Sequence, residues 1–163
     1  SQPSDTTTLS VFGRNVDALQ VAELLRGINH GEIDPDTLSA LKLWHLMPVF
    51  DAAGVGIDEI NWLDLVKYEG HRQRSFVNLS PVLLKAVTSA AENHHVAETV
   101  LLTNWLMHDV ALDKGNPADL ASVIGALDEI GQSGTAKAFA QEVVKAHLMQ
   151  MLLAEKVPNG TQS

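Results

Sequence analysis

The sequence of 163 residues contains no cysteine, which excludes disulfides, zinc–thiolate sites and thiol catalysis. This absence is compatible with both the periplasm and the cytoplasm, so it assigns no compartment. Aromatic residues are also scarce, with three Trp, four Phe and one Tyr. Because β-strands draw on β-branched and aromatic side chains, this composition favours packed helices over a β-sandwich.

Basic residues are few: 11 Lys and Arg stand against 20 Asp and Glu, for a formal net charge of −9. Binding to a nucleic-acid backbone depends on clustered Lys and Arg, so no nucleic-acid partner is expected. No apolar run reaches the roughly 18 residues that a membrane span requires. The hydrophobic fraction of 45%, with 19% charged residues, is instead typical of a soluble chain with a folded core.

One phrase occurs three times in the chain: a helix-capping residue, a proline, and apolar residues three and six positions after the proline. It is found at Asp34-Pro35, Ser80-Pro81 and Asn116-Pro117. The capping side chain accepts a hydrogen bond from an otherwise unpaired amide in the first helical turn. Proline at the next position has its φ pre-set for a helix and loses only an amide that had no helical partner. Each phrase therefore predicts the start of a helix.

Together with glycine stops and apolar stripes of helical period, these starts predict an all-α fold of about seven helices arranged as antiparallel hairpins. The helices are expected at about 15–26, 35–54, 58–69, 81–91, 96–113, 117–130 and 135–154, with Pro48 kinking or breaking the second. Residues 15–156 are expected to form a single domain, and 1–14 and 157–163 to be flexible tails. The polar opening without Met suggests a processed protein or part of a larger one.

Two of the predicted helices differ in their apolar pattern. Residues 117–130 carry a single clean stripe, which predicts that Leu127 is buried at its centre. Residues 96–113 are apolar over a wide arc, which predicts a helix in the middle of the bundle with neighbours on several sides.

The second and third phrases also suggest an internal repeat, because superposing Pro81 on Pro117 aligns apolar positions in both first helices. Independent helices that each begin with a capped proline would give the same phrase. Residues 116–120 and 124–131 resemble tetratricopeptide-like helical-hairpin repeats, such as the helical segments of larger bacterial proteins. The resemblance covers about residues 80–150. It implies a scaffold or a partner-binding surface and no catalytic residue.

The candidates for chemistry are few. Glu92 and His95 have the E-x-x-H spacing of di-iron helical bundles, but the chain has no second such pair and the spacing straddles a predicted turn. Asp64, inside an apolar run, is a candidate for the buried carboxylate of a helical, muramidase-like hydrolase. His45, His108 and His147 are expected to be hydrogen-bonded core residues. No catalytic residue, metal ligand or cofactor site is assigned.

Two groups of residues are candidates for partner binding. The only basic concentration consists of Lys67, His71, Arg72 and Arg74, which could contact an acidic partner or a small anion. The end of the last helix is apolar nearly all round, so Met149, Leu152 and Leu153 are expected to contact an earlier helix, a second copy or a partner subunit.

The sequence therefore favours a protein–protein interaction or scaffold module that binds another protein or associates with itself. The alternative is a helical hydrolase or a metal-binding bundle. The two functions predict different structural features. An enzyme needs convergent titratable groups in a cleft, and an interaction module needs an exposed apolar patch.

Overall fold

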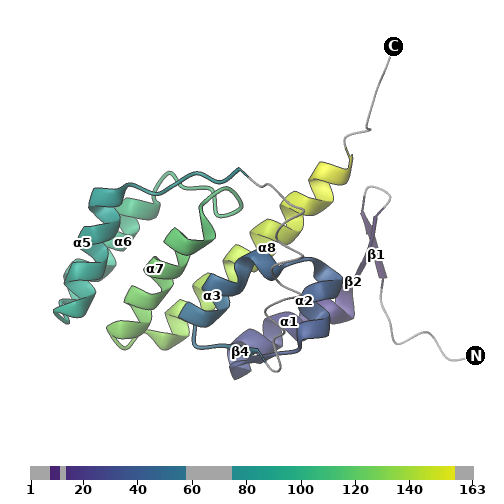
Figure 1. The fold of residues 1–163 in the computed structure, drawn as a ribbon, viewed down its shortest axis with the longest axis horizontal. Helices are drawn as coiled ribbons and strands as arrows, with labels where there is room; N and C mark the ends of the chain where they lie inside the picture. The colour runs from purple at the N-terminus through teal and green to yellow at the C-terminus, as the bar shows by residue number, and fades with distance from the viewer. Residues whose placement is uncertain (1–7, 12–13, 58–74, 157–163) are drawn as a thin grey trace, which may run out of the picture.

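A computed structural model describes residues 8–11, 14–57 and 75–156. In chain order the elements are β1 (Thr8–Val11), β2 (Arg14–Asp17), α1 (Ala18–His30), β3 (Glu32–Ile33), α2 (Pro35–Leu41), the 3₁₀ turn η1 (Trp44–Leu46), α3 (Met47–Ala52), β4 (Gly56–Ile57), α5 (Pro81–Glu92), α6 (Val96–Met107), α7 (Pro117–Glu129) and α8 (Ser133–Lys156). The fold is all-α, as predicted, with only short strand pairs beside the helices (Figure 1).

All three capped prolines begin helices as predicted. The Asp34 side chain accepts a hydrogen bond from the Asp36 amide at 3.0 Å in α2. Ser80 caps α5 at 3.4 Å, and Asn116 caps α7 through the Ala118 amide at 2.9 Å. The agreement follows from local chemistry, because a cap and its helix lie within four residues of each other.

The segment expected as one helix over residues 35–54 is divided. Lys42 adopts a left-handed conformation with φ of 57° and ends α2. The chain then passes through η1 before α3 begins. The break expected at Pro48 therefore occurs earlier, and Pro48 lies in the first turn of α3, where its missing amide costs no helical bond.

The strands were not predicted. β1 and β2 pair as an antiparallel hairpin within and just after the segment expected to be a tail, and α1 begins only at Ala18. β3 and β4 pair in parallel, with Glu32 opposite Gly56 and Ile33 opposite Ile57. Two-residue strands so far apart in the chain have no alternation for a sequence pattern to detect.

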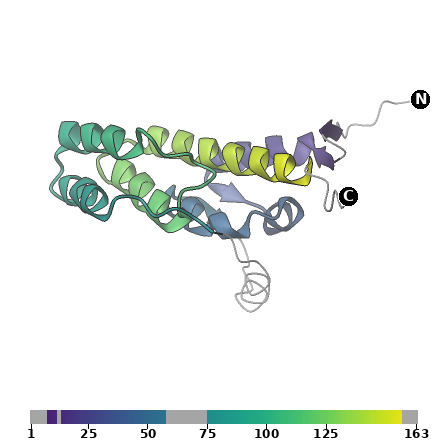
Figure 2. The ribbon, with the colours of Figure 1, turned by 90° about the horizontal axis from the view of Figure 1, so that it is seen from above.

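The helices form an elongated body with α5 and α6 at one end and the last turns of α8 at the other (Figures 1 and 2). α7 packs against α3, α5 and α8, and α8 packs against α1. α5 and α6 are joined by residues 93–95 and pack against each other. α7 and α8 are joined by residues 130–132 and do the same. The repeat relationship between these two pairs stays a prediction.

The hydrophobic core follows the central helices. Its fully buried side chains include Leu24, Ile28, Leu38, Phe50, Val87, Leu120, Ile124, Val143 and Val144. Leu127 is only 4% exposed, which confirms the burial predicted from the stripe of α7. The apolar side chains that remain exposed therefore lie outside this core.

Candidate interaction surface

The outer side of α6 carries a row of exposed apolar side chains. Leu101 is 72% exposed and Trp105 is 67% exposed. Ala97 lies one turn before Leu101 on the same side of the helix and is also exposed. Val96 and Val100 are also exposed, but they lie around the helix from this row, with Val96 opposite Trp105. We call Ala97, Leu101 and Trp105 the α6 face.

The inner side of α6 carries both apolar and polar side chains. Leu106 is buried against the core, but two of the other buried positions are Thr99 and Thr103. The Thr99 hydroxyl donates to the His95 carbonyl at 2.7 Å. Among the described residues, the Thr103 hydroxyl oxygen has no hydrogen-bond partner. α6 thus has apolar side chains on both sides: Leu102, Leu106 and Met107 pack toward the core, and Leu101 and Trp105 face outward.

The predicted position of this helix in the middle of the bundle is wrong. Within the described part of the chain, α6 packs substantially only against α5 and, less extensively, against α7, and it lies at the end of the molecule (Figure 1). The wide apolar arc was read correctly, but periodicity does not say which neighbours cover it. The helix also ends at Met107 instead of Asp113. His108, expected in the core, follows it with an exposed side chain.

Charge is sparse on α6. Its only ionisable residue is Glu98, beside the α6 face. Glu98 is paired with His95, whose Nδ1 lies 3.1 Å from the Glu98 Oε2 atom. The α6 face itself therefore carries no ionisable residue, and the one carboxylate of the helix lies beside a histidine.

The end of α8 has a smaller apolar surface at the opposite end of the molecule (Figure 2). Met149 is 56% exposed and Leu153 is 47% exposed, whereas Leu152 is half-buried and Met151 is buried. The core covers one side of this helix end, and Met149 and Leu153 remain open on the other. Their contact with a partner stays a prediction.

The basic concentration of Lys67, His71, Arg72 and Arg74 lies outside the described residues, as does Asp64. The proposed contacts of these side chains with an acidic partner stay predictions.

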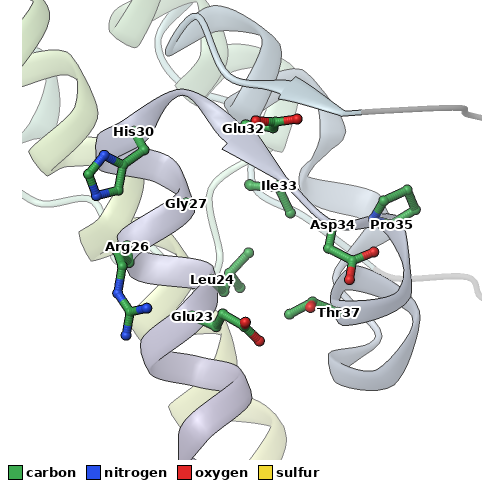
Figure 3. A pocket seen from close by; sticks show the side chains of 10 residues that line it. All are labelled: Glu23, Leu24, Arg26, Gly27, His30, Glu32, Ile33, Asp34, Pro35 and Thr37. Atoms are coloured by element: carbon green, nitrogen blue, oxygen red, sulfur yellow. The ribbon is translucent and has the colours of Figure 1, made fainter.

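A groove of about 420 Å³ lies between α1, β3 and the start of α2. The side chains around it are Glu23, Leu24, Arg26, Gly27, His30, Glu32, Ile33, Asp34, Pro35 and Thr37. In Figure 3, Glu23 and Thr37 point toward each other across the groove, and Arg26 and His30 lie on the far side of α1. Gly27 lets α1 approach β3 closely, because a Cβ there would lie 2.5 Å from the Glu32 carbonyl oxygen.

The groove does not assemble a reactive group. Asp34 already caps α2, so one of its oxygens is engaged by the Asp36 amide. Among the described residues, no three His, Asp or Glu side chains are grouped so that they could hold a metal ion. Glu92 and His95 fall on either side of the turn that ends α5, where His94 has a φ of 58°, so they do not share one helical face.

A histidine pair lies buried between distant segments. His147 in α8 is almost fully buried, and its Nε2 lies 3.2 Å from the Leu112 carbonyl oxygen. Its Nδ1 lies 3.1 Å from the Nε2 of His45. With both rings neutral, the His147 Nε2 donates to the Leu112 carbonyl and its Nδ1 accepts from the His45 Nε2. Phe76 stacks on the His45 ring at a centroid distance of 6.2 Å.

The pair agrees with the expected core role of His147, whereas His45 is hydrogen-bonded but only half-buried. Their contact was not foreseen, because 102 residues separate them and nothing local in the sequence links them. The pair ties η1 to α8 and to the segment after α6. We assign it to structure, since both described His147 bonds are to groups of the chain itself.

Within the described residues, no helix combines the length and the apolar content needed to cross a bilayer. Comparison with protein-family models, with curated proteins and with solved structures finds no match to this chain.

Proposed function

We propose that this chain is a protein–protein interaction module that binds through the α6 face. The observation that supports the proposal most directly is the exposure of Leu101 and Trp105 side by side on one helix. Large contiguous apolar patches on soluble domains mark interaction sites, and Trp is enriched where binding energy concentrates.

The enzymatic alternative receives less support. The groove in Figure 3 has carboxylates but no nucleophile placed beside a base in the described hydrogen bonds. Asp64, the candidate of a hydrolase, lies outside the described residues. An interaction module requires only a stable fold with an exposed binding surface. The hydrophobic core of this chain and the exposed α6 face meet that requirement.

The test is affinity capture with the purified chain as bait. Leu101→Asp should abolish the capture of whatever protein the wild type binds, including untagged copies of itself, because it places a charge at the centre of an apolar contact. Leu19→Asp is the matched control, since Leu19 is also an exposed leucine but lies on α1, away from α6. Equal capture by both variants and the wild type would contradict the proposal.

A further inference from the structure

We infer that the groove between α1, β3 and α2 binds an organic cation, a primary ammonium carried on an unbranched aliphatic chain. This site is separate from the α6 face, so it does not depend on the proposed function. Three features of the groove support it: an apolar floor, a buried hydroxyl without a protein partner, and the sign of the charges around it.

The floor of the groove is apolar and held by the fold. Leu24 of α1 and Ile33 of β3 line the groove and are 1% and 2% exposed. Gly27 lets the backbones of α1 and β3 approach closely, since a Cβ there would lie 2.5 Å from the Glu32 carbonyl oxygen. β3 is in turn paired with β4. The fold itself therefore forms the groove, and its floor suits the methylene groups of an aliphatic chain.

The Thr37 side chain adds a polar group to this floor. It is only 6% exposed, and it points across the groove toward Glu23 (Figure 3). Within the part of the chain that the structure describes, the Thr37 hydroxyl makes no hydrogen bond. Buried hydroxyls in proteins nearly always have a partner, so this one is available to a ligand.

The charges around the groove determine the sign of the ligand. Glu23 of α1, Glu32 of β3 and Asp34 at the start of α2 all line it. The two basic lining residues, Arg26 and His30, lie on the far side of α1 (Figure 3). Three carboxylates from three different elements favour a cation and disfavour an anion. The net charge of −9 on the chain acts in the same direction.

The lining groups favour a primary ammonium over other cations. A metal ion is not favoured, because no three His, Asp or Glu side chains among the described residues are grouped to hold one. The described lining residues include no Phe, Tyr or Trp, whose faces hold quaternary ammonium groups. A primary ammonium has three N–H donors, which match carboxylate and hydroxyl acceptors. The volume of about 420 Å³ is near the lower end for small-molecule sites, which suits a short chain.

Glu23 and Thr37 are the two groups that hold the ammonium. They face each other from α1 and α2 (Figure 3). Neither side chain has a hydrogen bond or an ion pair with another described residue, whereas one oxygen of Asp34 is already bound to the Asp36 amide. The ammonium therefore lies between Glu23 and Thr37, and its aliphatic chain lies along the apolar floor.

The first experiment is a titration of the purified chain with n-hexylamine, followed by amide chemical shifts. The shifts should be confined to residues 23–37. 1-Hexanol should bind at least about tenfold more weakly because it has no charge, and hexanoate should not bind. From n-butylamine to n-hexylamine, each added methylene should lower the dissociation constant about fourfold, the equivalent of about 0.8 kcal/mol per buried methylene. Shifts spread over the whole acidic surface, or equal binding of 1-hexanol, would overturn the inference.

The second experiment removes the two groups that hold the ammonium. Thr37→Val keeps the shape of the side chain without its hydroxyl and should raise the dissociation constant of n-hexylamine about tenfold. Thr37→Ser keeps the hydroxyl and should stay within about threefold of wild type. Glu23→Gln should raise the dissociation constant about threefold, because the carboxylate is exposed. Glu129→Gln on α7 is the matched control, since it removes an exposed carboxylate that does not line the groove.

Both variants can be checked for folding. The Thr37 hydroxyl has no protein partner, so Thr37→Val should keep the amide spectrum and the melting temperature of the wild type. Glu23 is exposed, so Glu23→Gln tests the site even if Thr37→Val does not fold. An unchanged dissociation constant in every folded variant of the two positions would overturn the site.

The ammonium can belong to a free amine or to a lysine side chain of a peptide, and a third titration separates these sources. Nα-acetyl-lysine methylamide carries the ammonium on the same chain but with peptide groups attached. Binding at least as tight as that of n-pentylamine assigns the groove to a lysine side chain. Binding about tenfold weaker assigns it to a free amine. If neither compound shifts the amides of residues 23–37, the inference is wrong.

Discussion

At the scale of single residues, two leucines on neighbouring parts of the fold have opposite surroundings. Leu127 in α7 is 4% exposed at the centre of the core, whereas Leu101 in α6 is 72% exposed. The sequence predicted the first correctly, because Leu127 lies on a single narrow stripe with polar residues on the other side. It could not predict that Leu101 is exposed, because α6 has apolar residues on every side. The pattern does not show which of them the rest of the fold covers.

These two residues give a matched prediction for stability. Leu127→Ala should lower the free energy of unfolding by about 2–5 kcal/mol, since it removes buried methyl groups and leaves a cavity. Leu101→Ala should change it by less than about 0.5 kcal/mol in the monomer, since its side chain contacts little. Urea unfolding at low protein concentration measures both values. A small effect at Leu127 would mean that the stripe of α7 is not the core.

The pair of His45 and His147 shows which features could not be predicted from single residues. That His147 is a hydrogen-bonded core residue follows from its place between apolar neighbours in its helix. That His45 and the Leu112 carbonyl are its partners does not, because the contacts join segments 102 and 35 residues away. Only the three-dimensional fold brings these polar groups together and satisfies them.

At the scale of elements, the starts of helices were the most predictable feature. A cap, a proline and an apolar residue lie within one turn of each other, and local chemistry decides the outcome. The ends were less predictable. α2 ends at Lys42 in a left-handed conformation that its sequence does not favour, which divides the segment expected as a single helix. Contacts made elsewhere in the fold override such local preferences.

The cap of α7 gives a prediction at this scale. The Asn116 side chain accepts from the Ala118 amide at 2.9 Å and donates to Asn78 Oδ1 at 2.9 Å. Asn116→Ala should therefore lower the free energy of unfolding by about 1 kcal/mol. Asn116→Asp, the control, keeps a capping oxygen and should cost less. Chemical unfolding of the three proteins checks the order, and equal losses for both variants would contradict a role for the cap.

At the scale of the whole molecule, the sequence did not predict which helix faces pack against each other. The stripes predicted that helices pack, and the structure shows α7 between α3, α5 and α8 with α6 at the end. Nothing in the chain near α6 encodes that position. The candidate surface was consequently missed, although its residues were known to be apolar. The end of α8 was identified from sequence because its apolar residues exceed what one contact can cover.

The two apolar surfaces at opposite ends of the molecule lead to a last prediction. Met149→Gln with Leu153→Gln should leave the free energy of unfolding within about 0.5 kcal/mol of wild type, because both side chains are largely exposed. Met151→Gln, between these two positions but on the buried side of the same helix, should destabilise the chain by more than about 1 kcal/mol, because it buries an amide without an assigned partner. Thermal melting and light scattering of these variants separate the two roles. A fall in molar mass relative to the wild type, with unchanged stability, would assign a self-association contact to the end of α8.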